Sequence, residues 1–160
     1  MREVLTGYFA AEKLESWFFL GVGLAALAVA AWLWATGSGA RGMAVPLVLV
    51  GLIQAVVGAS VGLRTDAQVA ALTAQLEREP KGLQAAEVPR MEKVMANFTL
   101  YKVVELAVLL GGVALTVFLR RSEFAYFAGV GCVLQGSLML VLDLFAEHRG
   151  EAYLAALRAL

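Results

Sequence analysis

The sequence predicts an all-α integral membrane protein, with four transmembrane helices in an antiparallel bundle and a polar helical hairpin between the second and third. Three observations lead to this fold class. The 160-residue chain is 61% hydrophobic and 16% charged, whereas soluble domains are about half apolar and about a quarter charged. Its apolar residues fall into four runs, each close to the length of about 20 residues that crosses a bilayer. One polar segment, residues 64–97, separates the second run from the third.

The first span is expected over about residues 16–36. Residues 1–15 carry apolar side chains on one helical side among charged ones, which predicts an amphipathic helix that lies on the membrane surface or continues the span. The apolar run is longer than the stretch of about 7 to 15 residues in a signal peptide, so we interpret it as a retained span. Tryptophans near both of its ends fit the aromatic belts of membrane interfaces: Trp17, Trp32 and Trp34.

The second span is expected over about residues 43–63. The loop before it, residues 36–42, is short, so the first two spans should be antiparallel neighbours. Small and polar residues recur in the second span at spacings of three and four, which lets a neighbouring backbone approach closely. We expect this face to pack on another helix of the chain or of a homodimer. The helix-packing residues predicted in this way are Gly51, Gln54, Gly58 and Gly62, with Gln135 of the fourth span.

The polar segment 64–97 is expected to form a helical hairpin that extends the second and third spans. Apolar residues recur at helical spacing on both sides of residues 79–82, where Pro80 disfavours a helical conformation of the residue before it. Pro89 is tolerated near a helix start, which places a helix N-terminus close to it. The third span is expected over about 98–119, the fourth over about 124–143, and an amphipathic segment ends the chain.

The distribution of basic residues predicts the orientation. Nine of them lie on the side that holds both termini and the hairpin, against three on the side of the two short loops: Arg41, Arg120 and Arg121. Because cytoplasmic segments carry the excess of Lys and Arg, we expect both termini and the hairpin in the cytoplasm. The expected location is a bacterial inner membrane, with residues 1–160 as a single domain.

The third span carries charge that it cannot leave outside the membrane. Only 14 uncharged residues separate Glu105 from Arg120, so a span of about 20 residues must include Glu105 and extend toward Lys102. A charge at the bilayer centre costs about 2.5 to 3.5 kcal/mol on insertion scales, and such residues often mark ion or substrate pathways. Glu105 is expected roughly 10 Å below the cytoplasmic interface, at 1.5 Å per residue.

Other polar side chains are expected to gather with Glu105 in a cup that is open to the cytoplasm. The predicted ligand-binding residues are Glu105, Lys102, Tyr101, Asp143, Glu147 and Arg64. We expect them to bind or transport a small cationic or proton-coupled ligand, and a bundle of this size would need to dimerise to offer alternating access. In a second interpretation Glu105 is structural and pairs with Lys102 or Arg64.

The composition excludes several classes of function. Thirteen basic and thirteen acidic residues cancel, which leaves no broad basic face for nucleic acid. The single histidine, His148, and the single cysteine, Cys132, exclude the usual zinc ligand sets and an intrachain disulfide. We therefore predict no metal, no cofactor and no catalytic residue.

We expect the lipid bilayer to surround the four spans. Two alternatives to ligand binding remain. The first is a non-catalytic accessory or protective protein that docks to a membrane-protein partner through its hairpin. The second, with less support, is an enzyme that acts on lipid.

Overall fold

The computed structural model describes the whole chain, Met1–Leu160, as four long helices without strands. Helix α1 covers Arg2–Ala35, α2 Ala44–Arg78, α3 Pro80–Phe118 and α4 Glu123–Arg158, and a short 3-10 helix, η1, covers Gly39–Met43. Their 34 to 39 residues correspond to about 51 to 58 Å, well beyond the roughly 30 Å of a bilayer core. Each helix is long and apolar enough to cross a membrane. The prediction of an all-helical chain with four such helices is confirmed.

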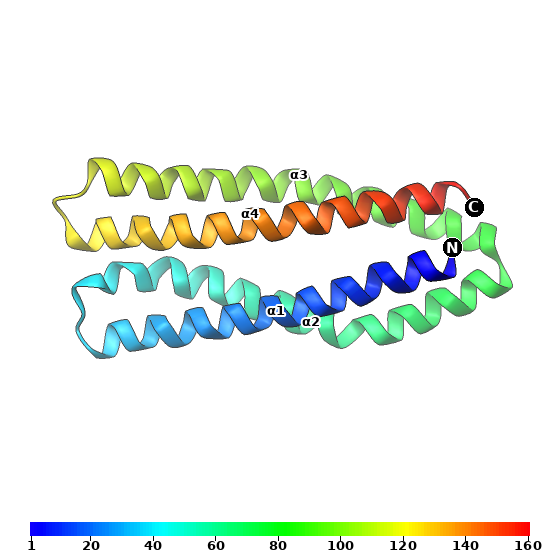
Figure 1. Ribbon diagram of the computed structural model, residues 1–160, viewed down its shortest axis with the longest axis horizontal. Helices are drawn as coiled ribbons and strands as arrows, with labels where there is room; N and C mark the ends of the chain where they lie inside the picture. The colour runs from blue at the N-terminus through cyan, green and yellow to red at the C-terminus, as the bar shows by residue number, and fades with distance from the viewer.

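The four helices alternate in direction along the chain. Figure 1 shows the α1–α2 and α3–α4 connections at one end of the molecule, with both termini and the α2–α3 turn at the other. Helix α1 packs mainly on α2, and α3 packs mainly on α4, so the molecule consists of two helix pairs, α1/α2 and α3/α4. Helix α4 makes most of the contacts between the pairs, whereas no Cα atom of α1 lies within 8 Å of one in α3.

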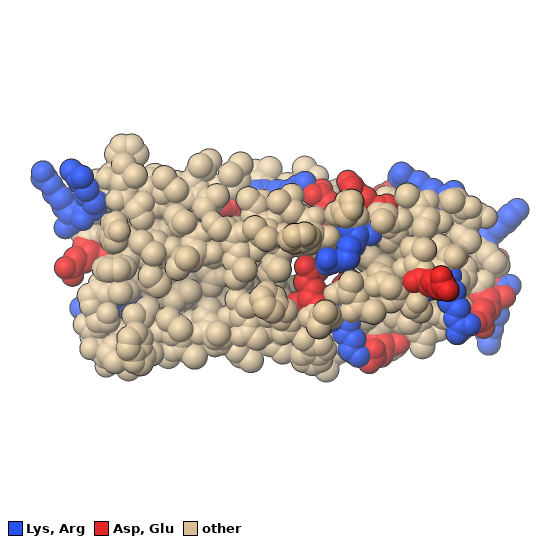
Figure 2. Space-filling model, in the orientation of Figure 1, with Lys and Arg blue, Asp and Glu red and all other residues tan.

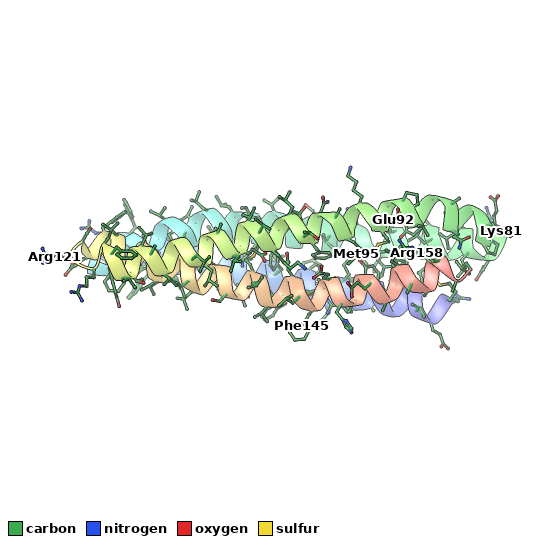
Figure 3. The ribbon with its side chains drawn as sticks, turned by 90° about the horizontal axis from the view of Figure 1, so that it is seen from above. Lys81, Glu92, Met95, Arg121, Phe145 and Arg158 are labelled. Carbon is green, nitrogen blue, oxygen red and sulfur yellow. The ribbon has the colours of Figure 1, made fainter.

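Charged side chains divide the molecule into two halves. Figure 2 shows a broad uncharged band, with charged side chains gathered toward the end that holds the termini and at the tip of the opposite end. We call residues 16–63 and 98–143 the apolar half and all other residues the polar half. Figure 3 places Arg121 at the outer tip of the apolar half and Lys81 at the far end of the polar half. The outer surface of the apolar half consists largely of exposed Leu, Val, Phe and Trp side chains, a composition typical of a lipid-facing surface.

Glycines bring α1 and α2 into close contact. A Cβ atom on Gly23 would lie 2.7 Å from the backbone nitrogen of Ala55, and one on Gly58 would lie 2.5 Å from the backbone oxygen of Ser16. Gly51 and Gly62 also face α1. Helix α1 therefore covers this face of α2, and the face is not free to form a homodimer, contrary to one of the two roles expected for it.

The polar half has a hydrophobic core of its own. Its buried residues come from α1, α3 and α4, with side chains of α2 packed against them: Leu5, Phe9, Met91, Tyr153, Leu154 and Leu157. Residues 1–15 thus continue α1 and pack with the hairpin, and the C-terminal segment does the same. The polar half is a four-helix bundle in which the chain termini cover the apolar face of the hairpin.

The turn between α2 and α3 is tighter than expected. Helix α2 ends at Arg78 and α3 begins at Pro80, so Glu79 alone interrupts the helices. Proline suits the first helical position because its N–H would have no partner there. The expectation of a helix start near Pro89 is wrong, since Pro89 lies inside α3. The carbonyl group that Pro89 leaves unbonded belongs to Ala85, which is exposed to solvent, where water can bond it.

Candidate functional site

Two glutamine side chains join the helix pairs inside the apolar half. Gln54 of α2 is 0% exposed, and its Nε2 donates a hydrogen bond of 3.2 Å to Oε1 of Gln135 on α4. The same Nε2 lies 3.5 Å from the sulfur of Met139, one turn along α4. The Oε1 atom of Gln54 is buried and has no hydrogen-bond partner. Both residues are buried, so this contact provides a polar link between α2 and α4 in otherwise apolar surroundings.

Glu105 is the buried acid of the apolar half. It is 5% exposed, and neither of its carboxylate oxygens has a hydrogen-bond partner. The carboxyl group of Asp143 on α4 faces it, as a like charge and, once a proton lies on the pair, as a hydrogen-bond partner. A buried carboxylate without a partner is strongly unfavourable, because it loses hydration and gains nothing in exchange. This pair of acids therefore requires a proton or a cation for neutrality.

The sequence positions these acids by helical spacing and a close backbone contact. Gln135, Met139, Asp143 and Glu147 follow one another at intervals of four, which places them along one side of α4. Gly136 allows α3 to approach that side, since a Cβ atom there would lie 3.3 Å from the backbone oxygen of Glu105. The contact sets Glu105 beside the polar side of α4.

Lys102 forms an ion pair with Glu147 and not with Glu105. Its Nζ donates to both carboxylate oxygens of Glu147, at 2.7 and 2.6 Å, and so links α3 to α4. Since Lys102 precedes Glu105 in α3, this ion pair lies about one turn closer to the polar half. The Lys102 to Glu105 contact that the spacing allowed is not formed.

The remaining predicted site residues lie elsewhere. Tyr101 is 48% exposed, and Arg64 is exposed and takes part in no ion pair. The structure therefore brings together four of the six predicted ligand-binding residues: Glu105, Asp143, Lys102 and Glu147. Neither basic side chain that was expected to neutralise Glu105 does so.

A second ion pair lies where α1 meets α4 near the border between the two halves. Arg149 donates a hydrogen bond to Glu15, and this is the only ion pair that joins the two helix pairs. Burial raises the pKa of Glu15, against the opposing effect of Arg149, and the charge of Asp143 also acts on it. Figure 2 shows a hollow among acidic and basic side chains where the uncharged band gives way to the polar half.

The polar half contains a buried network that the sequence analysis did not identify. Glu87 of α3 is buried and accepts hydrogen bonds from Arg90 at 2.7 Å and from the hydroxyl of Tyr153 at 3.3 Å. The ring of Tyr153 stacks on that of Tyr8, with 4.6 Å between centroids. Burial, and next the charge of Glu12, raise the pKa of Tyr8 to about 12. The sequence signal was Glu87 in helical register with the apolar residues around it.

Comparisons of the chain with protein-family models, with curated proteins and with solved structures return no match. No group of three or more His, Cys, Asp or Glu side chains lies together in a way that could hold a metal ion. A proposal of function for this chain therefore starts from its own side chains.

Proposed function

We propose that this protein binds protons or a small monovalent cation at Glu105 and Asp143 and carries them across a membrane. The observation that carries the proposal is the carboxyl group of Glu105, which is buried in the apolar half, forms no ion pair with a basic side chain and faces only the carboxyl group of Asp143. Ionisable residues in membrane spans are expensive and usually functional. Binding of a proton or cation gives the buried carboxyl group of Glu105 such a role.

The charge balance of the surrounding groups supports this proposal. Lys102 and Glu147 neutralise each other, and so do Arg149 and Glu15. Glu105 and Asp143 are then left without a counterion, so a proton or cation on this pair restores balance. A monovalent charge fits better than a divalent metal ion, since no third acidic or metal-binding side chain completes a metal site.

The site faces the polar half in this conformation. Toward the polar half it is followed by the Lys102 to Glu147 ion pair, which lies near the border with water-exposed charge. Toward the short loops the interior is small and apolar, with a core formed by Ala26, Ala30, Leu33, Ala44 and Leu47. Transport therefore requires a second conformation. The interface between the helix pairs is the natural place for the change, because contacts there are fewer than within each pair.

We propose that the apolar half spans the bilayer, with the polar half and both termini in the cytoplasm of a bacterial cell. The nine to three distribution of basic residues supports this orientation. Single cysteines at the exposed positions Thr36 and Ala86, in a Cys132→Ala background, test it with an impermeant thiol reagent. We expect labelling of intact cells at position 36 only, and labelling at position 86 would reverse the orientation.

Proton flux into liposomes tests the function. The purified protein is reconstituted with a pH-sensitive dye in the lumen, and an inward flux is driven by a potassium diffusion potential. We expect flux with the wild type, loss of flux with Glu105→Gln, and retained flux with Glu151→Gln, a matched change at an exposed acid that forms no ion pair. Equal flux from wild type and Glu105→Gln would remove the basis of the proposal.

The alternative of a docking protein has less support. The apolar side chains of residues 66–97 pack into the core of the polar half, and none of the large ones is exposed. A partner of this hairpin would therefore have to recognise a polar surface, and no feature of that surface specifies one.

A further inference from the structure

We propose that Lys102 is a movable counterion of the site. It pairs with Glu147 when a proton or cation occupies Glu105 and Asp143, and it moves to these two carboxylates when the site is empty. The inference rests on the proposed function and adds to it a mechanism of release.

Four charged side chains form two rows across the α3–α4 contact. Lys102 precedes Glu105 by three residues in α3, and Asp143 precedes Glu147 by four in α4. Because the helices are antiparallel, Lys102 lies opposite Glu147, and Glu105 lies beside Asp143. The charge of Lys102 already acts on Asp143. One ammonium group therefore has three carboxylates within about one helical turn.

The ammonium group can move between these carboxylates without a backbone change. Residues three apart on a helix have Cβ atoms about 5 to 6 Å apart, and helical side chains lean toward the N-terminus. Glu105 thus leans back toward Lys102. The four-carbon stem of lysine is flexible, so rotation about its bonds is sufficient to transfer Nζ from Glu147 to Glu105.

The two positions of Lys102 leave different acids unpaired. With Lys102 on Glu147, the unpaired acids are Glu105 and Asp143, which then need the proton or cation. With Lys102 on the site, Glu147 is unpaired, and its side chain is 16% exposed near the polar half, where water reaches it more easily than it reaches Glu105. Occupancy by the ligand and by Lys102 is therefore mutually exclusive, and Lys102 displaces the ligand toward the polar half.

No other basic side chain can take this role. The remaining charged groups near the site are Glu15, on which the charge of Asp143 acts, and Arg149, which is bound to Glu15. The other basic residues of the apolar half are Arg41, Arg120 and Arg121, in or beside the short loops. Lys102 is the one ammonium group within the paired segments of α3 and α4 in that half.

Labelling of Glu105 by dicyclohexylcarbodiimide tests the inference without a known ligand. This apolar reagent adds to a protonated carboxyl group: the acid oxygen bonds to the central carbon, the proton passes to nitrogen, and the acyl group then migrates to that nitrogen. Nothing leaves, so the peptide that contains Glu105 gains the whole mass of the reagent. The rate of this mass gain reports how often Glu105 is protonated and not paired with Lys102.

Substitutions of the two partners of the ion pair should change the labelling of Glu105 in opposite directions. Lys102→Met removes the movable counterion, so the acids must hold a proton, and labelling of Glu105 should rise about tenfold. Glu147→Gln removes the alternative partner of Lys102, which then stays on the site, and labelling should fall by a similar factor. The double variant Lys102→Met/Glu147→Gln should behave as Lys102→Met alone.

A purely structural ion pair predicts a different pattern, because either single change would loosen α3 from α4 and change labelling in the same direction. The same sign of change in both single variants, or no labelling of Glu105 in any protein, overturns the inference. These outcomes are separate from the proposed function, which depends on the flux through Glu105→Gln. Loss of that flux together with same-sign labelling would reject the movable counterion and keep the transport site.

Discussion

Substitution by alanine should change the stability of the protein in opposite directions at two adjacent glycines of α3. A Cβ atom on Gly112 would lie 2.7 Å from the backbone oxygen of Gly129 and 2.9 Å from the backbone nitrogen of Val133, both on α4. A Cβ atom on Gly111 would meet no atom within 4 Å. The substitution is the same and the positions are neighbours, so differences in helix propensity cancel.

The expected magnitudes follow from these distances. Ordinary contact begins at 3.4 Å, so Gly112→Ala must separate α3 from α4 by about 0.7 Å at their closest point. Overpacking of this kind costs about 1 to 3 kcal/mol. Gly111→Ala introduces no clash and improves helix propensity by up to about 1 kcal/mol. Because the gain in helix propensity is common to both variants, they should differ by the cost of the clash, about 1 to 3 kcal/mol in the free energy of unfolding.

Cys132 is a local reporter of this contact. It is the only cysteine, and its Cβ would lie 2.8 Å from a Cβ on Gly112. Heating the protein in mild detergent with a thiol-reactive dye should show a lower unfolding temperature for Gly112→Ala and an equal or higher one for Gly111→Ala than for the wild type. Equal shifts in the two variants would refute the packing of α3 on α4 at this glycine pair.

Three further predictions concern polar groups. Gln54→Leu should cost about 1 to 3 kcal/mol of stability, because it leaves Gln135 buried without its partner, whereas Gln54→Leu/Gln135→Leu should be close to neutral in thermal unfolding. Because the pKa of Tyr8 is raised from 10.0 to about 12, folding should lose up to roughly 2.7 kcal/mol as the pH rises through this range, and Tyr8→Phe should reduce that loss in unfolding at alkaline pH. Burial raises the pKa of Glu12 above 4.5, so the wild type loses stability as the pH rises above that value. Glu12→Gln should therefore be more stable than the wild type at pH 7 and equal to it at pH 4 in thermal unfolding; a wild type that is the more stable at pH 7 would contradict the sign.

The helices were predictable from the sequence, whereas the neighbours of their polar side chains were not. Run lengths and the proline at position 80 located the four helices and their main turn. Glu105 could be identified because too few uncharged residues follow it to keep it outside a span. The partner of Lys102 depends on the relative rotation of α3 and α4, which contacts such as that at Gly136 determine. Spacing along one helix contains no information about that rotation.

The network in the polar half was missed for a similar reason. Tyr8, Glu87 and Tyr153 come from three different helices and are far apart in the sequence, so no local pattern connects them. Pro89 was misplaced because its position was judged from helix propensity alone. Because Ala85 is exposed to solvent, water can bond the carbonyl group that Pro89 leaves without a donor. This exposure depends on how the four helices pack, so the local sequence does not predict it.

The division of the molecule into two helix pairs has a consequence for its synthesis. Each pair has its own close glycine contacts, at Gly23 and Gly58 in the first and at Gly112 and Gly129 in the second, so within the apolar half the α1/α2 pair can form its close contacts before the ribosome has made α3. The later meeting of the two pairs relies, within the apolar half, on α4, with its close contacts at Gly42 and Gly131, and on the hydrogen bond between the side-chain amides of Gln54 and Gln135. Glu79 alone connects the two helix pairs along the chain. We therefore expect each pair to pack first and the two pairs to meet in a single late step. At that step the acids of α3 and α4 first come under the cover of α1 and α2.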